Sequence, residues 1–145
     1  MTANVFVDTN VLLYAFDQAD PKKQSAARAW RSELWINKRG RVSVQVLQEF
    51  YANVVRKWPT AREPARAEIR NLQAWHPLAM DTELLARGWQ LQERYQLSFW
   101  DSLIVAAAKS SACKFLLTED LQPGQDFDDI IVINPFLNAP DSLGS

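Results

Sequence analysis

The stretch that decides the fold is Asn4–Tyr14, which reads NVFVDTNVLLY. It opens with the apolar run Val5-Phe6-Val7, whose residues favour strands, and this run stops at Asp8. A second apolar run then begins at Val11 and has the character of a helix. Because open α/β sheets bind ligands at the carboxyl ends of their strands, Asp8 is a candidate site residue. The alternative is that Asp8 or Thr9 only caps the helix that follows.

The rest of the chain continues this alternation of strands and helices. Short apolar runs predict strands at 4–7, 41–43, 77–80, 114–117 and 130–133, with helical patterns between them. Such alternation predicts a three-layer α/β/α fold, with a central, mostly parallel sheet of about five strands. The length of 145 residues predicts one domain, which we expect to cover residues 1–137, followed by a loose tail at 138–145.

Composition excludes several classes of function. The formal net charge is −1, so an anionic substrate must be held by a local basic patch or by bound metal rather than by a global basic field. The chain has one Cys and one His, which excludes an internal disulfide and a zinc site built from these residues, and it fits a reducing cytoplasm. We expect no membrane segment, because no apolar run approaches the ~20 residues that a spanning helix needs.

Four acidic residues stand in settings where carboxylates are uncommon. Asp8 and Asp120 both follow apolar strands, and the ends of parallel strands lie at one edge of a sheet. Glu49 lies within an apolar helical face, and Asp101 begins a helix that is apolar all round. Buried carboxylates are rare unless they are paired or bind metal. Without a nearby His, four converging acids favour a hard divalent cation, Mg²⁺ or Mn²⁺.

Each acid also has a simpler explanation. Asp101 can belong to a capping box that begins its helix. Glu49 can form an ion pair with an arginine such as Arg56, and Glu119 and Asp120 can be an ordinary acidic turn after a strand. Spacing alone leaves these alternatives open.

Five segments, in order, carry a resemblance to a known family. They are FVDTNVLLYAFD at 6–17, SVQVLQEFYANVVRK at 43–57, LSFWDSLIVAAA at 97–108, LLTEDLQPGQ at 116–125 and VINPF at 132–136. With these segments the chain resembles PIN-domain proteins, and specifically the VapC-like ribonuclease toxins of type II toxin–antitoxin systems. The resemblance implies a metal-dependent endoribonuclease that acts on RNA, binds a cognate antitoxin protein and forms a homodimer.

The resemblance also assigns roles to residues. It implies that Asp8, Glu49 and Asp101 are metal-site acids, and that Asp120 is the fourth through the pattern Thr118-Glu119-Asp120. Glu119 departs from the family pattern and leaves the choice between the two neighbouring acids open. Groups expected to support the site, by orienting carboxylates or water, are Thr9, Asn10, Ser43, Thr118 and Glu119. We expect one or two Mg²⁺ or Mn²⁺ ions, with Asp8 and Asp101 as the closest ligands.

RNA contacts are expected from the densest basic clusters, Lys38-Arg39-Gly40-Arg41 and Arg56-Lys57. The residues assigned to RNA are Arg39, Arg41, Arg56 and Lys57. The alternative is that these residues are solvated helix ends. Hydrolysis by an activated water predicts products with 5′-phosphate and 3′-hydroxyl ends.

Three other functions compete with a toxin nuclease. One is a housekeeping RNA-processing PIN nuclease, and another is a non-catalytic PIN-fold module that binds RNA or protein. The third is a phosphoaspartate protein with Asp8 as the acceptor. A phosphatase of that kind wants a second Asp two positions later, where this chain has Asn10.

Overall fold

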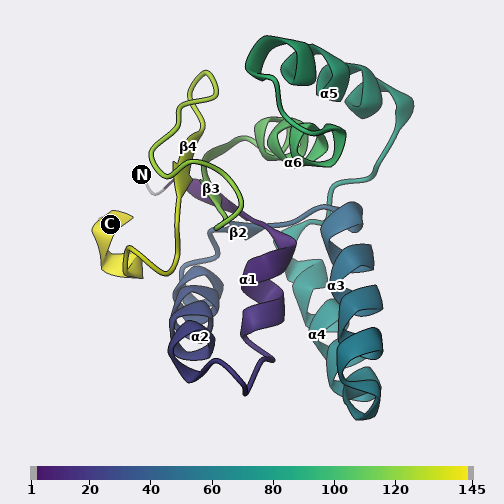
Figure 1. Ribbon diagram of the computed structural model, residues 1–145, viewed down its shortest axis with the longest axis vertical. Helices are drawn as coiled ribbons and strands as arrows, with labels where there is room; N and C mark the ends of the chain where they lie inside the picture. Colours follow the sequence, from purple (N-terminus) through teal and green to yellow (C-terminus); the bar gives the residue numbers. More distant parts are fainter. Residues whose placement is uncertain (1–2, 144–145) are drawn as a thin grey trace.

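The sheet is built around β1 (Asn4–Val7), which lies between two neighbours in a computed structural model that describes residues 3–143 (Figure 1). The strand order is β2 (Gly40–Arg41), β1, β3 (Cys113–Leu117) and β4 (Ile131–Ile133). All three pairings are parallel, so every strand presents its carboxyl end at the same edge. The α/β fold with a parallel sheet is therefore confirmed.

The strand expected at 77–80 is reduced to a single bridge. Leu78 pairs in parallel with Ser43, and its backbone exchanges hydrogen bonds with Val42 and Val44 at 3.0 and 2.9 Å. The pairing ends there because Ser43 already caps the next helix, so the chain leaves the sheet edge. The segment extends the sheet beside β2 without forming a regular strand.

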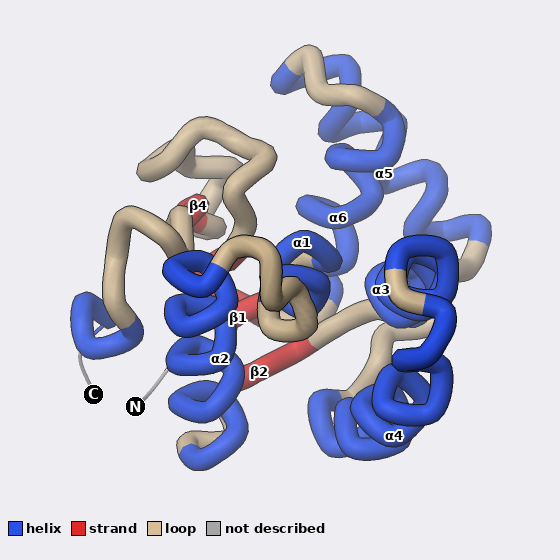
Figure 2. Tube along the Cα trace, turned by 60° about the horizontal axis from the view of Figure 1, so that its bottom comes forward, coloured by secondary structure: helices blue, strands red, loops and turns tan. Residues whose placement is uncertain are grey.

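Helices flank both faces of the sheet. In Figure 1, α5 and α6 stand together at the top, and α1 to α4 occupy the lower half; Figure 2 shows α2 beside β1 and β2. The α-helices are α1 (Thr9–Tyr14), α2 (Pro21–Ile36), α3 (Val44–Lys57), α4 (Arg62–Leu72), α5 (Thr82–Tyr95) and α6 (Phe99–Ser110). Three 3₁₀ turns complete the list: η1 (Pro59–Ala61), η2 (Gln73–Trp75) and η3 (Pro140–Leu143).

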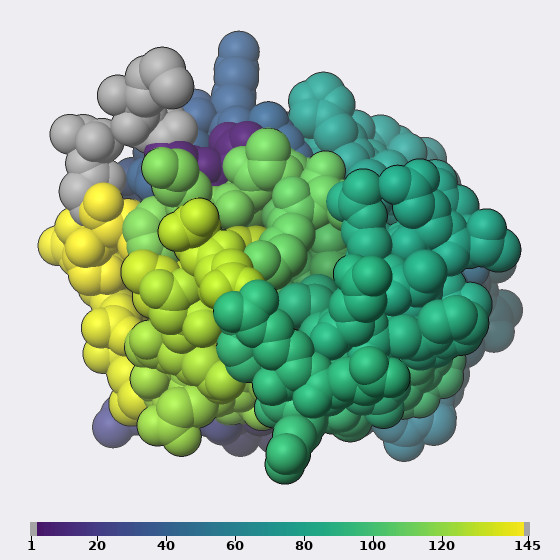
Figure 3. All heavy atoms as spheres, turned by 90° about the horizontal axis from the view of Figure 1, so that it is seen from above, coloured from purple at the N-terminus to yellow at the C-terminus, as the bar shows by residue number. Residues whose placement is uncertain are grey.

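The core explains the apolar runs in β1 and α6. Val5, Phe6 and Val7 are all buried, which requires cover on both faces of the strand. Helix α6 is buried from Ser102 to Ala108 because it packs against both β3 and α5. On the face seen in Figure 3, α5 adjoins the loop between β3 and β4, and Arg94 pairs there with Asp128.

The C-terminal segment differs from the expected loose tail over its described part. The η3 turn contacts α2, and Leu143 packs against the core. The buried Trp30 donates its indole N–H to the carbonyls of Pro135 and Asn138 at 3.2 and 2.9 Å. A buried Trp needs an acceptor for this N–H, so the segment after β4 is held in place. The last two residues of the expected tail, 144–145, lie outside the described residues.

Within residues 3–143, no helix has the length and apolar character needed to cross a membrane.

Candidate metal-binding site

Asp8 occupies the carboxyl end of β1 and begins α1. Its Oδ1 accepts a hydrogen bond from the Thr9 backbone N–H at 2.7 Å, so the carboxylate caps the helix as well as lying at the sheet edge. The residue is only 6% exposed. The capping role and the site role are therefore compatible, because only one of the two carboxylate oxygens faces the helix.

The end of β3 supplies the second part of the site. Val7 pairs with Leu117, which places Thr118 beside Asp8. The Thr118 hydroxyl donates to Asp8 Oδ2 at 2.8 Å, and it accepts the Asp120 backbone N–H at 3.1 Å. Two strand ends that are 110 residues apart in sequence are thus joined at a buried contact.

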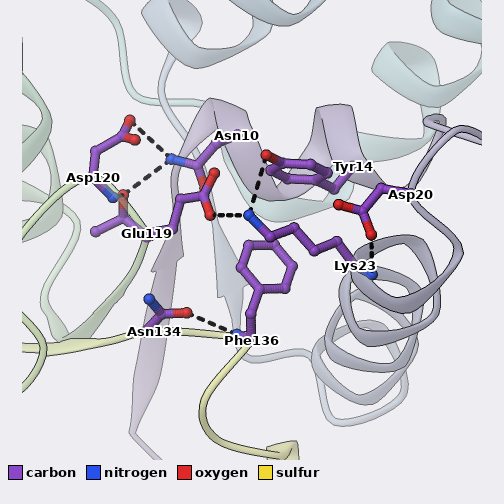
Figure 4. A network of polar contacts seen from close by, with 9 residues as sticks. Asn10, Tyr14, Asp20, Lys23, Glu119, Asp120, Asn134 and Phe136 are labelled. Atoms are coloured by element: carbon purple, nitrogen blue, oxygen red, sulfur yellow. Dashed lines mark hydrogen bonds and ion pairs between the residues drawn. The ribbon is translucent and has the colours of Figure 1, made fainter.

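Asn10 connects Asp120 to this pair. Its side-chain N–H group donates to Asp120 Oδ2 at 3.0 Å (Figure 4). The same group donates to Thr118 Oγ1 at 3.1 Å, with a longer contact of 3.4 Å to Asp8 Oδ2. Asp120 is exposed, unlike Asp8. One amide therefore orients the solvent-facing acid relative to the buried one.

Glu49 approaches from α3. Its Oε1 accepts from Gln45 Nε2 at 3.2 Å and lies 3.5 Å from the Thr9 hydroxyl. Ser43 accepts the Val46 N–H at 3.3 Å and fixes the start of the helix that carries Glu49. Thr9 consequently links α1 to α3 at the site.

Asp101 remains apart from the other three acids. It lies in the first turn of α6, half-buried, and its backbone N–H donates to the cap residue Ser98 at 3.1 Å. Among residues 3–143 its carboxylate makes no hydrogen bond or ion pair, and no three acidic, His or Cys side chains lie close enough to hold one ion. The structure thus links Asp8, Glu49 and Asp120 through Thr9, Asn10 and Thr118, and leaves Asp101 unlinked.

Burial raises the pKa of Asp8 from 3.8 to about 7. Desolvation is the main cause, and the nearby charges of Asp120 and Glu49 add to it. The hydrogen bonds from Thr118 and Thr9 act in the opposite direction. A carboxylate in this environment is stabilised by a cation, which would restore its ionised form at neutral pH.

Two amide oxygens beside the acids also lack donors. Asn10 Oδ1 and Gln45 Oε1 are buried and accept no hydrogen bond from the described part of the chain. Both belong to side chains whose N–H groups serve the acids. The atoms near Asp8 that could bind a metal ion are therefore carboxylate and amide oxygens, which are the ligands that Mg²⁺ and Mn²⁺ prefer.

Glu119 points away from Asp120 and toward α2. Its carboxylate pairs with Lys23 Nζ at 2.8 Å, and Lys23 also donates to the Tyr14 hydroxyl at 3.3 Å (Figure 4). Of the two neighbouring acids, Asp120 is the one that contacts Asn10.

The basic residues assigned to RNA lie in different environments. Arg39 is 5% exposed, and its Nε donates to the Ala3 carbonyl at 2.7 Å. Arg41 donates to the carbonyls of Lys38, three residues earlier, and of the adjacent Gly40. Arg56 and Lys57 are exposed at the end of α3. Arg39 is thus unavailable to a ligand, because its side chain belongs to the packing of the chain's start.

Two residues were missed by the sequence reasoning. Gln45 is 6% exposed and one helical turn before Glu49, a spacing that could have indicated the contact. Lys23 gave no such signal, because its partner Glu119 is 96 residues away. Cys113 plays no visible part: burial raises the pKa of its thiol to about 12, so the thiol stays protonated.

The fold and the site together define a class of protein: an α/β protein with a parallel sheet and acidic residues, here Asp8 and Asp120, at the carboxyl ends of its strands. The sequence profile of the PIN domain matches residues 5–129, and the chain belongs to this family. No curated protein sequence gives a significant match.

Solved structures that share the fold include the following three. A toxin–antitoxin complex from Klebsiella pneumoniae is 19% identical, with a TM-score of 0.66, and the match covers 91% of this chain and 98% of the other. VapC20 of Mycobacterium tuberculosis, described as a toxin that cleaves the Sarcin-Ricin loop, is 20% identical with a TM-score of 0.61, covering 78% and 87%. VapBC2 of Rickettsia felis, bound to a DNA fragment from its promoter, is 15% identical with a TM-score of 0.57, covering 88% and 96%.

Proposed function

We propose that the chain is a metal-dependent endoribonuclease and the toxin of a toxin–antitoxin pair. Membership of the PIN family and the likeness to toxin structures support this proposal. The single observation that carries it is the buried Asp8, whose carboxylate is linked through Thr118 and Asn10 to Asp120. A carboxylate kept in such a costly environment calls for a function that uses it.

Asp8, Glu49, Asp101 and Asp120 are the residues that would hold one or two Mg²⁺ or Mn²⁺ ions. Because no three of them meet in the arrangement seen, holding one ion between them requires some of the side chains to rotate. When bound, a divalent ion supplies a reactive water at neutral pH and stabilises charge on the phosphoryl group.

The neighbouring polar residues fix where these acids point. Thr118 holds Oδ2 of Asp8, and Asn10 holds Asp120 at the solvent side. Gln45 holds Glu49 from within the same helix. Contacts of this kind limit the range over which these acids would have to rotate to meet on one ion.

RNA would be held by basic side chains that reach solvent: Arg56 and Lys57, which are exposed, and Arg41, which is half-buried. We leave Arg39 out of this set because it is buried. Because a net charge of −1 gives no global attraction to RNA, binding would rest on these local contacts to phosphates, which salt weakens. We further propose a cytoplasmic homodimer that binds a cognate antitoxin protein.

The test is cleavage of RNA by the purified chain, freed of copurifying protein by denaturing chromatography and refolding. Cleavage is compared with Mg²⁺, with Mn²⁺ and with EDTA, for wild type, Asp8→Asn and Asp101→Asn. Asp81→Asn is the matched control, because Asp81 caps α5 as Asp8 caps α1 but lies away from the acids.

We expect metal-dependent cleavage that Asp8→Asn and Asp101→Asn abolish and that Asp81→Asn retains, with 5′-phosphate ends on the products. Cleavage that persists in EDTA or in Asp8→Asn would overturn the proposal. Products with 2′,3′-cyclic phosphates would exclude this chemistry as well. A refolded chain that binds RNA but never cuts it would be a non-catalytic PIN module.

A further inference from the structure

Lys23 lies beside the acidic site but contacts none of the four acids assigned to metal. It belongs to the first turn of α2, and its ammonium pairs with Glu119 Oε2 at 2.8 Å in the loop that follows β3 (Figure 4). The same ammonium donates to the Tyr14 hydroxyl at 3.3 Å. The contact joins segments that are far apart in sequence, since 96 residues separate Lys23 from Glu119.

Two aromatic rings hold the Lys23 ammonium in position. Its Nζ lies 4.7 Å from the centre of the Tyr14 ring and 4.9 Å from that of Phe136. The two rings meet edge to face, with centroids 5.0 Å apart. Cations are attracted to the faces of aromatic rings, so the ammonium is fixed by α1 and by the segment after β4 as well as by Glu119.

Glu119 and Asp120 are neighbours in one loop, and their side chains take different partners. Asp120 accepts from Asn10, which contacts Asp8, whereas Glu119 accepts from Lys23 (Figure 4). Without Lys23, the Glu119 carboxylate would lose its ion-pair partner and keep only the neutral Tyr14 hydroxyl, so it could turn toward the Asn10 amide and compete with Asp120 for it. Both competitors for the Asn10 N–H are carboxylates, whereas a neutral glutamine at position 119 would accept this hydrogen bond less strongly.

The geometry points to Lys23 as a positioning residue that holds Glu119 out of the acidic site and so leaves Asp120 as the carboxylate facing Asn10 and Asp8. This inference rests on the proposed nuclease function for its effect on rate, but not for its effect on the position of Asp120. The Lys23 and Glu119 side chains are 34% and 22% exposed. Ion pairs with such exposure contribute little to folding, so the loss of Lys23 should alter the site more than the stability.

The first experiment compares three variants. Lys23→Met removes the ammonium and keeps an apolar stem between Tyr14 and Phe136. Lys22→Met is the matched control, because Lys22 is exposed and adjacent on the same helix turn. The double variant Lys23→Met with Glu119→Gln also removes the charge that Lys23 holds.

We expect Lys23→Met to lower kcat for RNA cleavage by about tenfold with KM nearly unchanged, as for other residues that orient metal ligands. Lys22→Met should cleave like wild type, and the double variant should recover most of the lost rate. A merely structural role for Lys23 predicts no recovery when Glu119 is neutralised. Wild-type kcat in Lys23→Met, or no recovery in the double variant, would overturn the inference.

A second measurement does not depend on cleavage. The side-chain amide signals of Asn10 in a ¹⁵N NMR spectrum report its hydrogen bond to Asp120. We expect them to shift in Lys23→Met, to stay in place in Lys22→Met and to return toward wild type in the double variant. Unshifted signals in Lys23→Met contradict the inference even if the protein never cuts RNA; absent cleavage with the expected shifts contradicts only the proposed nuclease.

Discussion

Thr118 donates its hydroxyl to Asp8 Oδ2 at 2.8 Å across the pairing of β1 and β3. The hydroxyl oxygen of Thr118 in turn accepts from the Asn10 side chain and from the Asp120 backbone N–H. The Thr118 side chain, which is 0% exposed, therefore connects the ends of β1 and β3 in one network of hydrogen bonds.

Replacing Thr118 with Val keeps the shape of the side chain and removes this connection. Asp8 then loses a donor in a buried position, which should cost on the order of 1–3 kcal/mol of unfolding free energy in urea denaturation. RNA cleavage should fall by about tenfold or more, because both Asp8 and Asp120 lose an orienting contact. Thr60→Val, at an exposed position in η1, is the control and should change neither quantity. Unchanged cleavage in Thr118→Val would show that the Asp8 position is fixed by its Thr9 contact alone.

Local sequence predicts much of this site, because caps and strand ends depend on neighbouring residues. Asp8, Ser43 and Ser98 each accept a backbone N–H at the start of a helix, as their positions before apolar runs indicate. The parallel sheet follows from the alternation of strands and helices, but the order of its four strands does not, and the segment around Leu78 makes only one bridge.

What sequence could not predict depends on partners far along the chain. Lys23 sets the direction of the Glu119 side chain, and Trp30 holds the segment after β4 in place. Arg39 belongs to an evident basic cluster, yet its side chain is buried against Ala3. Composition gives the charge of a cluster but not which of its members face solvent.

The raised pKa of Asp8 predicts that stability depends on pH. Unfolded, Asp8 releases its proton near pH 4; folded, it holds the proton until about pH 7, because burial disfavours the charge. The folded state thus binds more protons between these values, so the unfolding free energy falls as pH rises through this window and stays low above it.

Asp8→Asn should remove this fall in unfolding free energy, because asparagine carries no ionisable proton. In EDTA at pH 8 we expect the variant to exceed wild type in unfolding free energy by a few kcal/mol, on the order set by a shift of this size. The gain should shrink toward pH 4, where the wild-type residue is protonated in both states. Asp81→Asn, at an exposed cap, should show no comparable gain. Equal stability of Asp8→Asn and wild type at pH 8 would mean that the buried carboxylate is compensated within the chain.

Divalent ions should stabilise wild type for the same reason. At pH 7.5, Mn²⁺ or Mg²⁺ at a hundred times its dissociation constant adds about 2.7 kcal/mol to the folded state, which raises Tm in a thermal melt. Asp8→Asn should lose most of this rise, and Asp81→Asn should keep it. An equal rise in all three proteins would place the ion elsewhere on the chain.

Gln45 offers a way to separate the orientation of Glu49 from the packing of α3. Its N–H group donates to Glu49 Oε1 at 3.2 Å, while its own Oε1 is buried without a donor from the described residues. Gln45→Leu removes the donor and also the unsatisfied oxygen, so the unfolding free energy should hold steady or rise. Cleavage should nevertheless fall by about tenfold, because Glu49 keeps only the longer contact to Thr9.

Gln48→Leu is the control for this variant, since Gln48 is exposed on the same helix. It should leave cleavage and stability close to wild type. A loss of activity in Gln45→Leu at unchanged urea midpoint assigns Gln45 to the orientation of the acid, because a packing defect would lower both quantities together. Full activity in Gln45→Leu would mean that Glu49 needs no partner on α3, and that Thr9 alone keeps it directed at the site.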